Sequence, residues 1–149
     1  MDIAALIISI LAVLFTGLSY AESKAANANS KNAIRTNKKM FRRQGIIDLH
    51  MAWNDVKEIN PDKLVTPDIV RAVNAMSLTA SLWNHDVIEK AILYQSYWNN
   101  YRKLYETLID LDKQVPGKNE TCKELVTNDI KRAYEAMKNV NLEKVITNL

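Results

Sequence analysis

The chain is poor in the residues that bend or cross-link a polypeptide. Its 149 residues include only three Gly, three Pro and one Cys. A single cysteine excludes an intramolecular disulfide, and so few Gly and Pro leave few sites for tight turns. Abundant Ala, Leu, Lys, Asn and Glu favour helices instead. The sequence therefore predicts an all-α fold, and its length allows one domain beyond an anchor segment.

Groups that carry chemistry are also few. The two histidines, His50 and His85, have no second His or Cys at the three- or four-residue spacing with which one helix chelates a metal. The sequence contains no phosphate-binding loop, dinucleotide fingerprint, nucleophile elbow or CxxC pair. We therefore expect no enzyme activity, no metal and no cofactor. We expect the lone Cys122 to be a small, partly buried side chain rather than a reactive thiol.

One long stretch lacks charge altogether. Residues 3–21 are nineteen consecutive uncharged positions, which span about 28 Å as a helix and approach the ~30 Å thickness of a bilayer core. The next twenty-four residues carry seven Lys or Arg against the single acid Glu22, a net charge of +6. Basic residues beside a membrane helix stay in the cytoplasm. The pattern predicts an uncleaved single-pass anchor in the inner (plasma) membrane, with the C-terminal body cytoplasmic.

A cleaved signal peptide is the competing interpretation. Ser19-Tyr20-Ala21 offers small residues where signal peptidase cuts, but the segment before the apolar run has no basic residue, as a signal would need. The anchor is therefore preferred. Six basic residues after it are candidate contacts with anionic lipid at the membrane surface: Lys31, Arg35, Lys38, Lys39, Arg42 and Arg43. The same charges would also be explained if these residues only kept a linker segment solvated.

Small residues recur within the predicted anchor. Ala5, Ser9, Gly17 and Ala21 fall on one line of four-residue spacing, interrupted at Val13, and small residues in that register let two membrane helices approach closely. They are candidate residues for self-association.

Helix signals divide the chain into an anchor (1–21), a basic juxtamembrane stalk (22–45) and a helical domain (46–149). The helix of the stalk should continue to Asn60-Pro61, with Ile46, Leu49 and Trp53 on its buried face. Further helices are predicted from Thr66 to about Trp83, with Thr66 as cap, and from Val87 to about Leu111, with Asn84 as cap. Thr121 and Glu124 form a capping box for the next helix, and a short last one begins near Leu142. The sum is a small antiparallel bundle of about four helices.

Aromatic residues concentrate between Val87 and Leu111. Tyr94, Trp98, Tyr101 and Tyr105 recur at near-heptad spacing, which could stack a planar ligand or anchor a protein, but is more typical of a core. Tyr97 lies off this seam and is predicted as an exposed contact.

Loose motifs spread over these helices carry a family resemblance: Arg43, the stretch from Ile47 to Asn54, Asn74, Val87-Ile88-Glu89, Trp98, and Tyr105 to Ile109. On these residues, positions 25–111 resemble a family of small uncharacterised bacterial and phage proteins. The resemblance implies an N-terminal membrane helix, a basic stalk and a helical domain, and it implies no activity. The segment after Pro116 lies outside it.

These observations favour a membrane-tethered, non-enzymatic interaction module on the cytoplasmic face. Its expected partners are the lipid bilayer, a second copy of the chain and an unidentified protein. Nucleic acid is an unfavoured partner because only Phe41 interleaves the basic run. Two alternatives stay open: a membrane-active factor of phage or prophage type that alters permeability or excludes infection, and an exported helical protein cleaved after Ala21.

Overall fold

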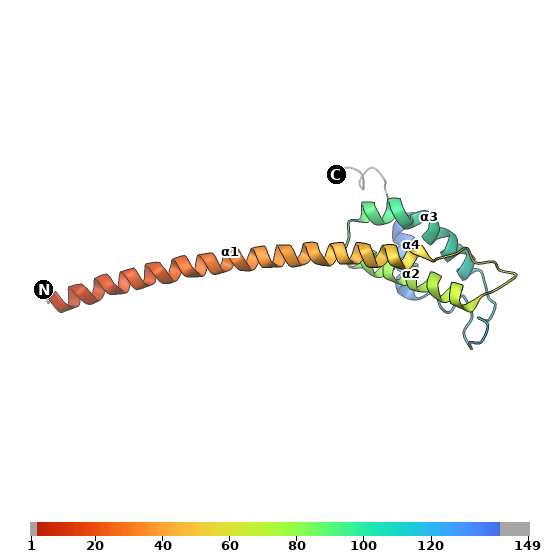
Figure 1. Cartoon of the computed structure of the whole chain (residues 1–149), viewed down its shortest axis with the longest axis horizontal. Coiled ribbons are helices and arrows are strands. Elements are labelled where there is room, and N and C mark those ends of the chain that lie inside the picture. The colour runs from red at the N-terminus through yellow and green to blue at the C-terminus, as the bar shows by residue number, and fades with distance from the viewer. Residues whose placement is uncertain (1–2, 141–149) are drawn as a thin grey trace. The chain divides into compact units, whose positions relative to one another are not determined.

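The fold is described from a computed structural model (Figure 1). It describes the backbone of residues 3–140 and the side chains of residues 15–17, 19, 20 and 22–140. Within 3–140 the regular structure is helical, and the predicted all-α class is confirmed. The helices are α1 (Ile3–Asn54), α2 (Thr66–Asn84), α3 (Lys90–Ile109) and α4 (Asn128–Lys138).

The chain divides into two compact units, Met1–Phe41 and Arg42–Leu149. We call them the N-terminal unit and the helical domain. The division falls inside the segment predicted as the stalk, residues 22–45.

The N-terminal unit is helical from Ile3 onward. All its described side chains are exposed, including the large apolar groups Phe15, Tyr20, Ile34, Met40 and Phe41. Across the residues whose side chains are described, no helix is long and apolar enough to cross a membrane. Most of the predicted anchor, residues 1–14, 18 and 21, lies outside that description, so the anchor at 1–21 stays a prediction.

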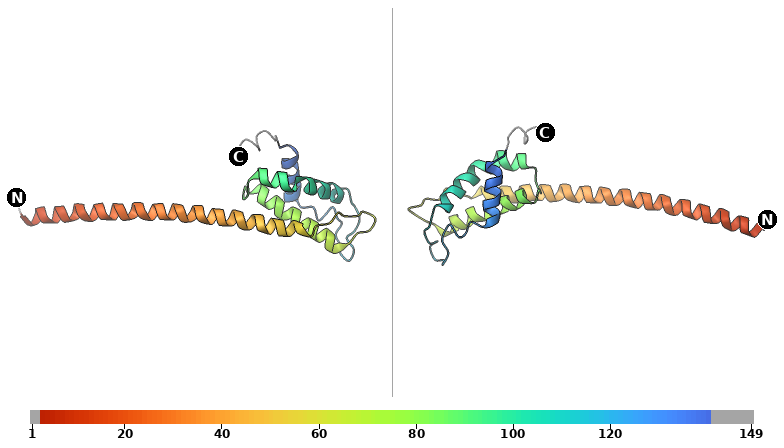
Figure 2. Two further views of the ribbon diagram at one scale, coloured as in Figure 1. Left: turned by 45° about the horizontal axis from the view of Figure 1, so that its top comes forward. Right: turned by 180° about the vertical axis from the view of Figure 1, so that it is seen from behind.

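The core of the helical domain lies between the last turns of α1 and helices α2, α3 and α4. Leu49 and Trp53 of α1 are 1% and 9% exposed, as their spacing predicts, whereas Ile46 remains 37% exposed. Helix α2 packs against α3 and α4, and α3 packs against α4 (Figure 2). The result is a helical bundle in which α2 contributes the largest set of fully buried side chains: Ile69, Ala72, Ala75, Met76, Thr79 and Ala80.

The end of α1 differs from the prediction. The helix ends at Asn54 rather than near Pro61, because the Val56 N–H donates to the Trp53 carbonyl at 3.2 Å and turns the chain. This turn brings the half-buried Val56 against the core. Residues 55–65 then form a connection to α2, where the sequence predicted one more turn of helix.

Two predicted caps have other roles. The cap of α2 is Val65, and the Thr66 hydroxyl instead donates a 2.6 Å hydrogen bond to the Pro116 carbonyl. The Asn84 amide donates to the Asp129 carbonyl at 3.1 Å rather than capping α3. Helix α3 begins at Lys90, later than predicted, because the chain first passes through Asp86 in a left-handed conformation with φ of 51°. Both misassigned polar side chains join segments that are distant in sequence.

The predicted capping box forms, but not at a helix start. The Thr121 N–H donates to Glu124 Oε2 at 2.7 Å, and the Glu124 N–H donates back to Thr121 Oγ1 at 3.3 Å. These bonds close a turn, and α4 begins only at Asn128, where Thr127 Oγ1 accepts from the Ile130 N–H. The predicted helix from Leu142 lies outside residues 3–140.

Candidate functional site

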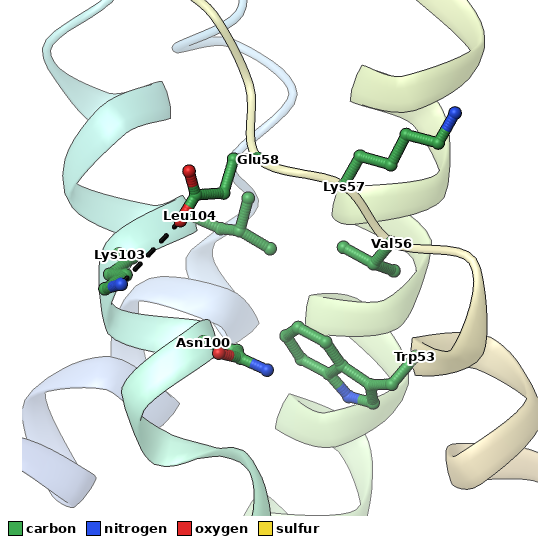
Figure 3. Close-up of a pocket in the computed structure, with 7 residues that line it drawn as sticks. All are labelled: Trp53, Val56, Lys57, Glu58, Asn100, Lys103 and Leu104. Carbon is green, nitrogen blue, oxygen red and sulfur yellow. Dashed lines mark ion pairs between the residues drawn. The ribbon is translucent and has the colours of Figure 1, made fainter.

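A small cleft of about 90 Å³ opens where the end of α1 and the segment after it face α3 (Figure 3). Trp53 and Val56 form one side, and Leu104 of α3 supplies apolar surface opposite. The polar members of the lining are Lys57, Glu58, Asn100 and Lys103. The early end of α1 creates this site, because it lets the segment after Asn54 turn toward α3.

The Trp53 ring is held rigidly on its side of the cleft. Its indole N–H donates to the buried Thr79 hydroxyl at 3.0 Å, and its ring stacks on Tyr97 with centroids 5.7 Å apart. Tyr97 is therefore half-buried against the core, and the prediction of an exposed contact at Tyr97 is wrong. The spacing of the aromatic residues within 87–111 could not predict this stacking, because Trp53 belongs to another helix.

The rim of the cleft is charged, but the histidine and the hydroxyl or thiol nucleophiles that many enzymes use are absent from its lining. Lys103 Nζ lies 3.7 Å from Glu58 Oε1, and these side chains are 66% and 90% exposed, so the ion pair is weak. None of the seven lining residues is a His, Cys, Ser or Thr. The cleft can admit one small apolar group beside polar side chains.

The basic residues predicted at the membrane surface do not all behave alike. Five are exposed on α1: Lys31, Arg35, Lys38, Lys39 and Arg43. Arg42 is half-buried, with Nη1 at 3.9 Å from Glu89 Oε1, just before α3. Arg42 is therefore the least exposed of the six predicted membrane-surface residues, since its side chain lies beside the segment that leads into α3.

Of the candidate self-association residues, the structure describes one. Gly17 lies on α1 with no other group within 4 Å of the position that a Cβ would occupy. The side chains of Ala5, Ser9 and Ala21 lie outside the description. The self-association hypothesis for these four residues therefore stays a prediction.

The aromatic seam of α3 belongs to the core. Trp98, Tyr101 and Tyr105 are buried, and the Tyr105 ring stacks on Tyr134 of α4 with centroids 3.9 Å apart. Burial raises the pKa of Tyr101, and its hydroxyl donates to the Ile130 carbonyl at 2.9 Å. Tyr94 is half-buried and stacks on Trp98. The seam fills the space between α3 and α4, so these rings are not open to a planar ligand.

The remaining candidates for chemistry are the two histidines and Cys122. His50 and His85 are both exposed, and no group of His, Cys, Asp and Glu able to hold a metal occurs among the described residues. Cys122 is fully buried, more than predicted, and burial raises the pKa of its thiol. A thiol in this setting is protonated and shielded, as expected of a packing residue.

Comparisons of the chain with protein-family models, with curated proteins and with solved structures find no match. The resemblance of residues 25–111 to small bacterial and phage proteins therefore stays a prediction.

Proposed function

We propose that this protein is a membrane-tethered, non-enzymatic interaction module whose helical domain is held at the cytoplasmic face of the inner membrane. The observation that carries the proposal is the change from nineteen uncharged residues to a segment of net charge +6 along one helix. An uncharged helix of this length suits a bilayer core, and the basic residues after it suit an anionic surface.

The exposure of the basic residues supports the lipid contact. Lys31, Arg35, Lys38 and Lys39 make no ion pair within the described part of the chain, so their ammonium and guanidinium groups are available to lipid phosphates. Each basic residue close to an anionic membrane contributes about 1 kcal/mol. Exposed Ile34 and Phe41 lie among these charges in the sequence and add apolar surface of the kind that enters the headgroup region.

The side chains on the surface of the helical domain support a binding role. Its cleft at Trp53 is lined by apolar and charged side chains, and the lining holds no histidine and no nucleophilic hydroxyl or thiol. The buried tyrosines and Cys122 are packed inside the domain and cannot reach a substrate. Binding of a partner is the activity that this surface suits best.

Membrane fractionation and a topology reporter test the proposal together. The full chain, carrying at Leu149 a reporter that is active on one side of the membrane only, should remain in the membrane after alkaline extraction and report a cytoplasmic C-terminus. Replacement of Leu11 and Leu14 by Arg should release it, because a charge at the centre of a membrane helix costs about 2.5 to 3.5 kcal/mol. The matched control places two arginines at the same spacing at the exposed positions Asn29 and Asn32.

Recovery of a soluble form that begins at Glu22 would overturn the tether and favour export. The lipid contact has a separate readout, the binding of the extracted chain to vesicles with and without anionic lipid. Exchange of Lys38 and Lys39 for Glu, which lowers the net charge of residues 22–45 from +6 to +2, should weaken the preference for anionic vesicles. Exchange of Lys118 and Lys123 for Glu in the helical domain should preserve it.

A further inference from the structure

The face of α1 that points away from the domain core carries exposed apolar side chains. Leu49 and Trp53 bury one side of the helix, while Ile47 and Met51, four residues apart on the opposite side, are 52% and 62% exposed. No element of the helical domain covers them among the described residues. Met40, one heptad before Ile47, is 57% exposed.

These residues belong to a stripe without charge. Counting at heptad spacing from Ile47 and Met51 gives ten positions between residues 23 and 54: Ser23, Ala26, Ser30, Ala33, Asn37, Met40, Gln44, Ile47, Met51 and Asn54. None is charged, although this part of α1 holds seven basic residues and the acidic Asp48. Taken as the a and d positions of a coiled coil, the ten positions form a seam that is uncharged over more than four heptads and apolar at Ala26, Ala33, Met40, Ile47 and Met51.

The charged residues beside the stripe are complementary between two parallel copies. With Met51 at position a, Arg43 occupies g and Asp48 occupies e, and in a parallel coiled coil a g residue meets the e residue five positions later on the partner helix. Arg43 would therefore face Asp48 of the second copy, twice by symmetry. Gln44 Nε2 donates to Asp48 Oδ1 at 2.7 Å and holds the carboxylate beside the stripe.

The other basic residues are placed so that they do not oppose this pairing. Lys24, Lys31 and Lys38 occupy position b, Lys39 occupies c, and Arg35 and Arg42 occupy f, all on the outer side. Of the seven, only Arg43, which has an acidic counterpart, lies beside the stripe. An anionic or purely apolar partner would not explain why the charges of both signs are arranged in this way.

We propose that α1 pairs with α1 of a second copy as a parallel, in-register coiled coil, centred on Met40, Ile47 and Met51. This pairing needs no membrane tether, because only the exposed face of α1 and its charges take part. Ser, Asn and Gln occupy half of the ten positions, so the pairing is weak per heptad and its register is set by polar layers. At Ile47 and Met51 the contact stays off the domain core, since Leu49 and Trp53 pack on the opposite face of α1.

Cysteine cross-linking of the full chain in detergent tests the pairing. Met51→Cys and Ile47→Cys should form disulfide-linked dimers on mild oxidation, because equivalent a or d residues face each other across the parallel pair. Asn32→Cys and Ala28→Cys, exposed on the outer side, should give several-fold less dimer. The wild-type chain, in which the sole thiol of Cys122 is buried, should give none. Equal yields from all four variants would overturn the proposal.

A charge exchange tests the register. Arg43→Asp and Asp48→Arg, each in the Met51→Cys background, should lower the dimer yield several-fold because each places like charges in contact, and the double exchange should restore it. Ile47→Lys should also abolish the dimer while leaving the helical circular dichroism unchanged, since Ile47 is outside the core. A double exchange that fails to restore the dimer, or a dimer insensitive to Ile47→Lys, would contradict the parallel pairing.

Discussion

The indole N–H of Trp53 donates a 3.0 Å hydrogen bond to the hydroxyl of Thr79, and both residues are buried. The Thr79 hydroxyl in turn donates to the Ala75 carbonyl at 2.7 Å, so one polar chain runs from the end of α1 into the middle of α2. This relationship fixes the register of the last turns of α1 against the other helices of the domain, and it is the first target for mutation.

Thr79→Val should destabilise the helical domain by about 1 to 3 kcal/mol. The substitution keeps the shape of the side chain but leaves the Trp53 N–H buried without an acceptor. Thr79→Ser, which keeps the hydroxyl, is the matched control and should lose less. Denaturant unfolding followed by tryptophan fluorescence measures both. If Val proved as stable as Thr, the hydrogen bond would have no net role.

Gly45→Ala should stabilise the helical domain by about 0.5 to 1 kcal/mol, because alanine lowers the backbone entropy cost of a helix. The added Cβ would lie 3.4 Å from Leu82 Cδ2 and Ile88 Cδ1, an ordinary packing distance. Gly45→Leu should instead destabilise, since those same side chains leave no room for a larger group. Thermal unfolding of the two variants gives opposite shifts in Tm if this packing is correct.

We expect the helical domain to lose stability at alkaline pH because of its packed tyrosines. Burial raises the pKa of Tyr97, Tyr101, Tyr105 and Tyr134 above the ordinary value of about 10. Their contribution to stability is therefore intact below about pH 10 and falls at higher pH, where the unfolded chain releases phenolic protons first. Tyr101→Phe should reduce this dependence. The free energy of unfolding against pH, with tyrosinate absorbance as the proton count, measures the effect.

Cys122 should react with a thiol reagent only when the helical domain opens. Its side chain is fully buried and its pKa is raised by burial, so the reactive thiolate is both scarce and shielded. The labelling rate should rise with denaturant in parallel with unfolding. A cysteine placed at the exposed Ser77 is the comparison and should react at once. Fast labelling of Cys122 in the native chain would contradict the packing of the loop before α4.

Replacement of Gly117 by Ala should cost about 1 kcal/mol, because Gly117 has φ of 75° and a Cβ is strained in that region. Asn tolerates a left-handed conformation better, so Gly117→Asn should cost less. No neighbouring atom among the described residues lies within 4 Å of the new Cβ, so any loss comes from the backbone. Equal thermal stability of the Ala and Asn variants would argue against this cause.

Helix type and core faces could be read from the sequence where the signal is local. Leu49 and Trp53 lie on one face of a single helix, as do Trp98, Tyr101 and Tyr105, and all five are buried. The reciprocal hydrogen bonds of Thr121 and Glu124 were also predicted, since they depend on four consecutive residues.

The features that the sequence could not supply depend on contacts between distant segments. Thr66 and Asn84 have the chemistry of caps, but Pro116 and Asp129 compete for them, and nothing near either residue in sequence indicates that competition. The cleft was missed for the same reason: Trp53 comes from α1 and Asn100 and Lys103 from α3. Tyr97 was misplaced because its partner, Trp53, lies in another helix.

The connection before α2 and the loop after α3 are fastened to each other. Thr66 donates to the Pro116 carbonyl, and Lys113 Nζ donates to the Pro61 carbonyl at 2.8 Å. Two segments that would each fray separately are thereby made to open together. One local unfolding event therefore exposes both loops to a protease, so that the two loops behave as a single site of proteolysis.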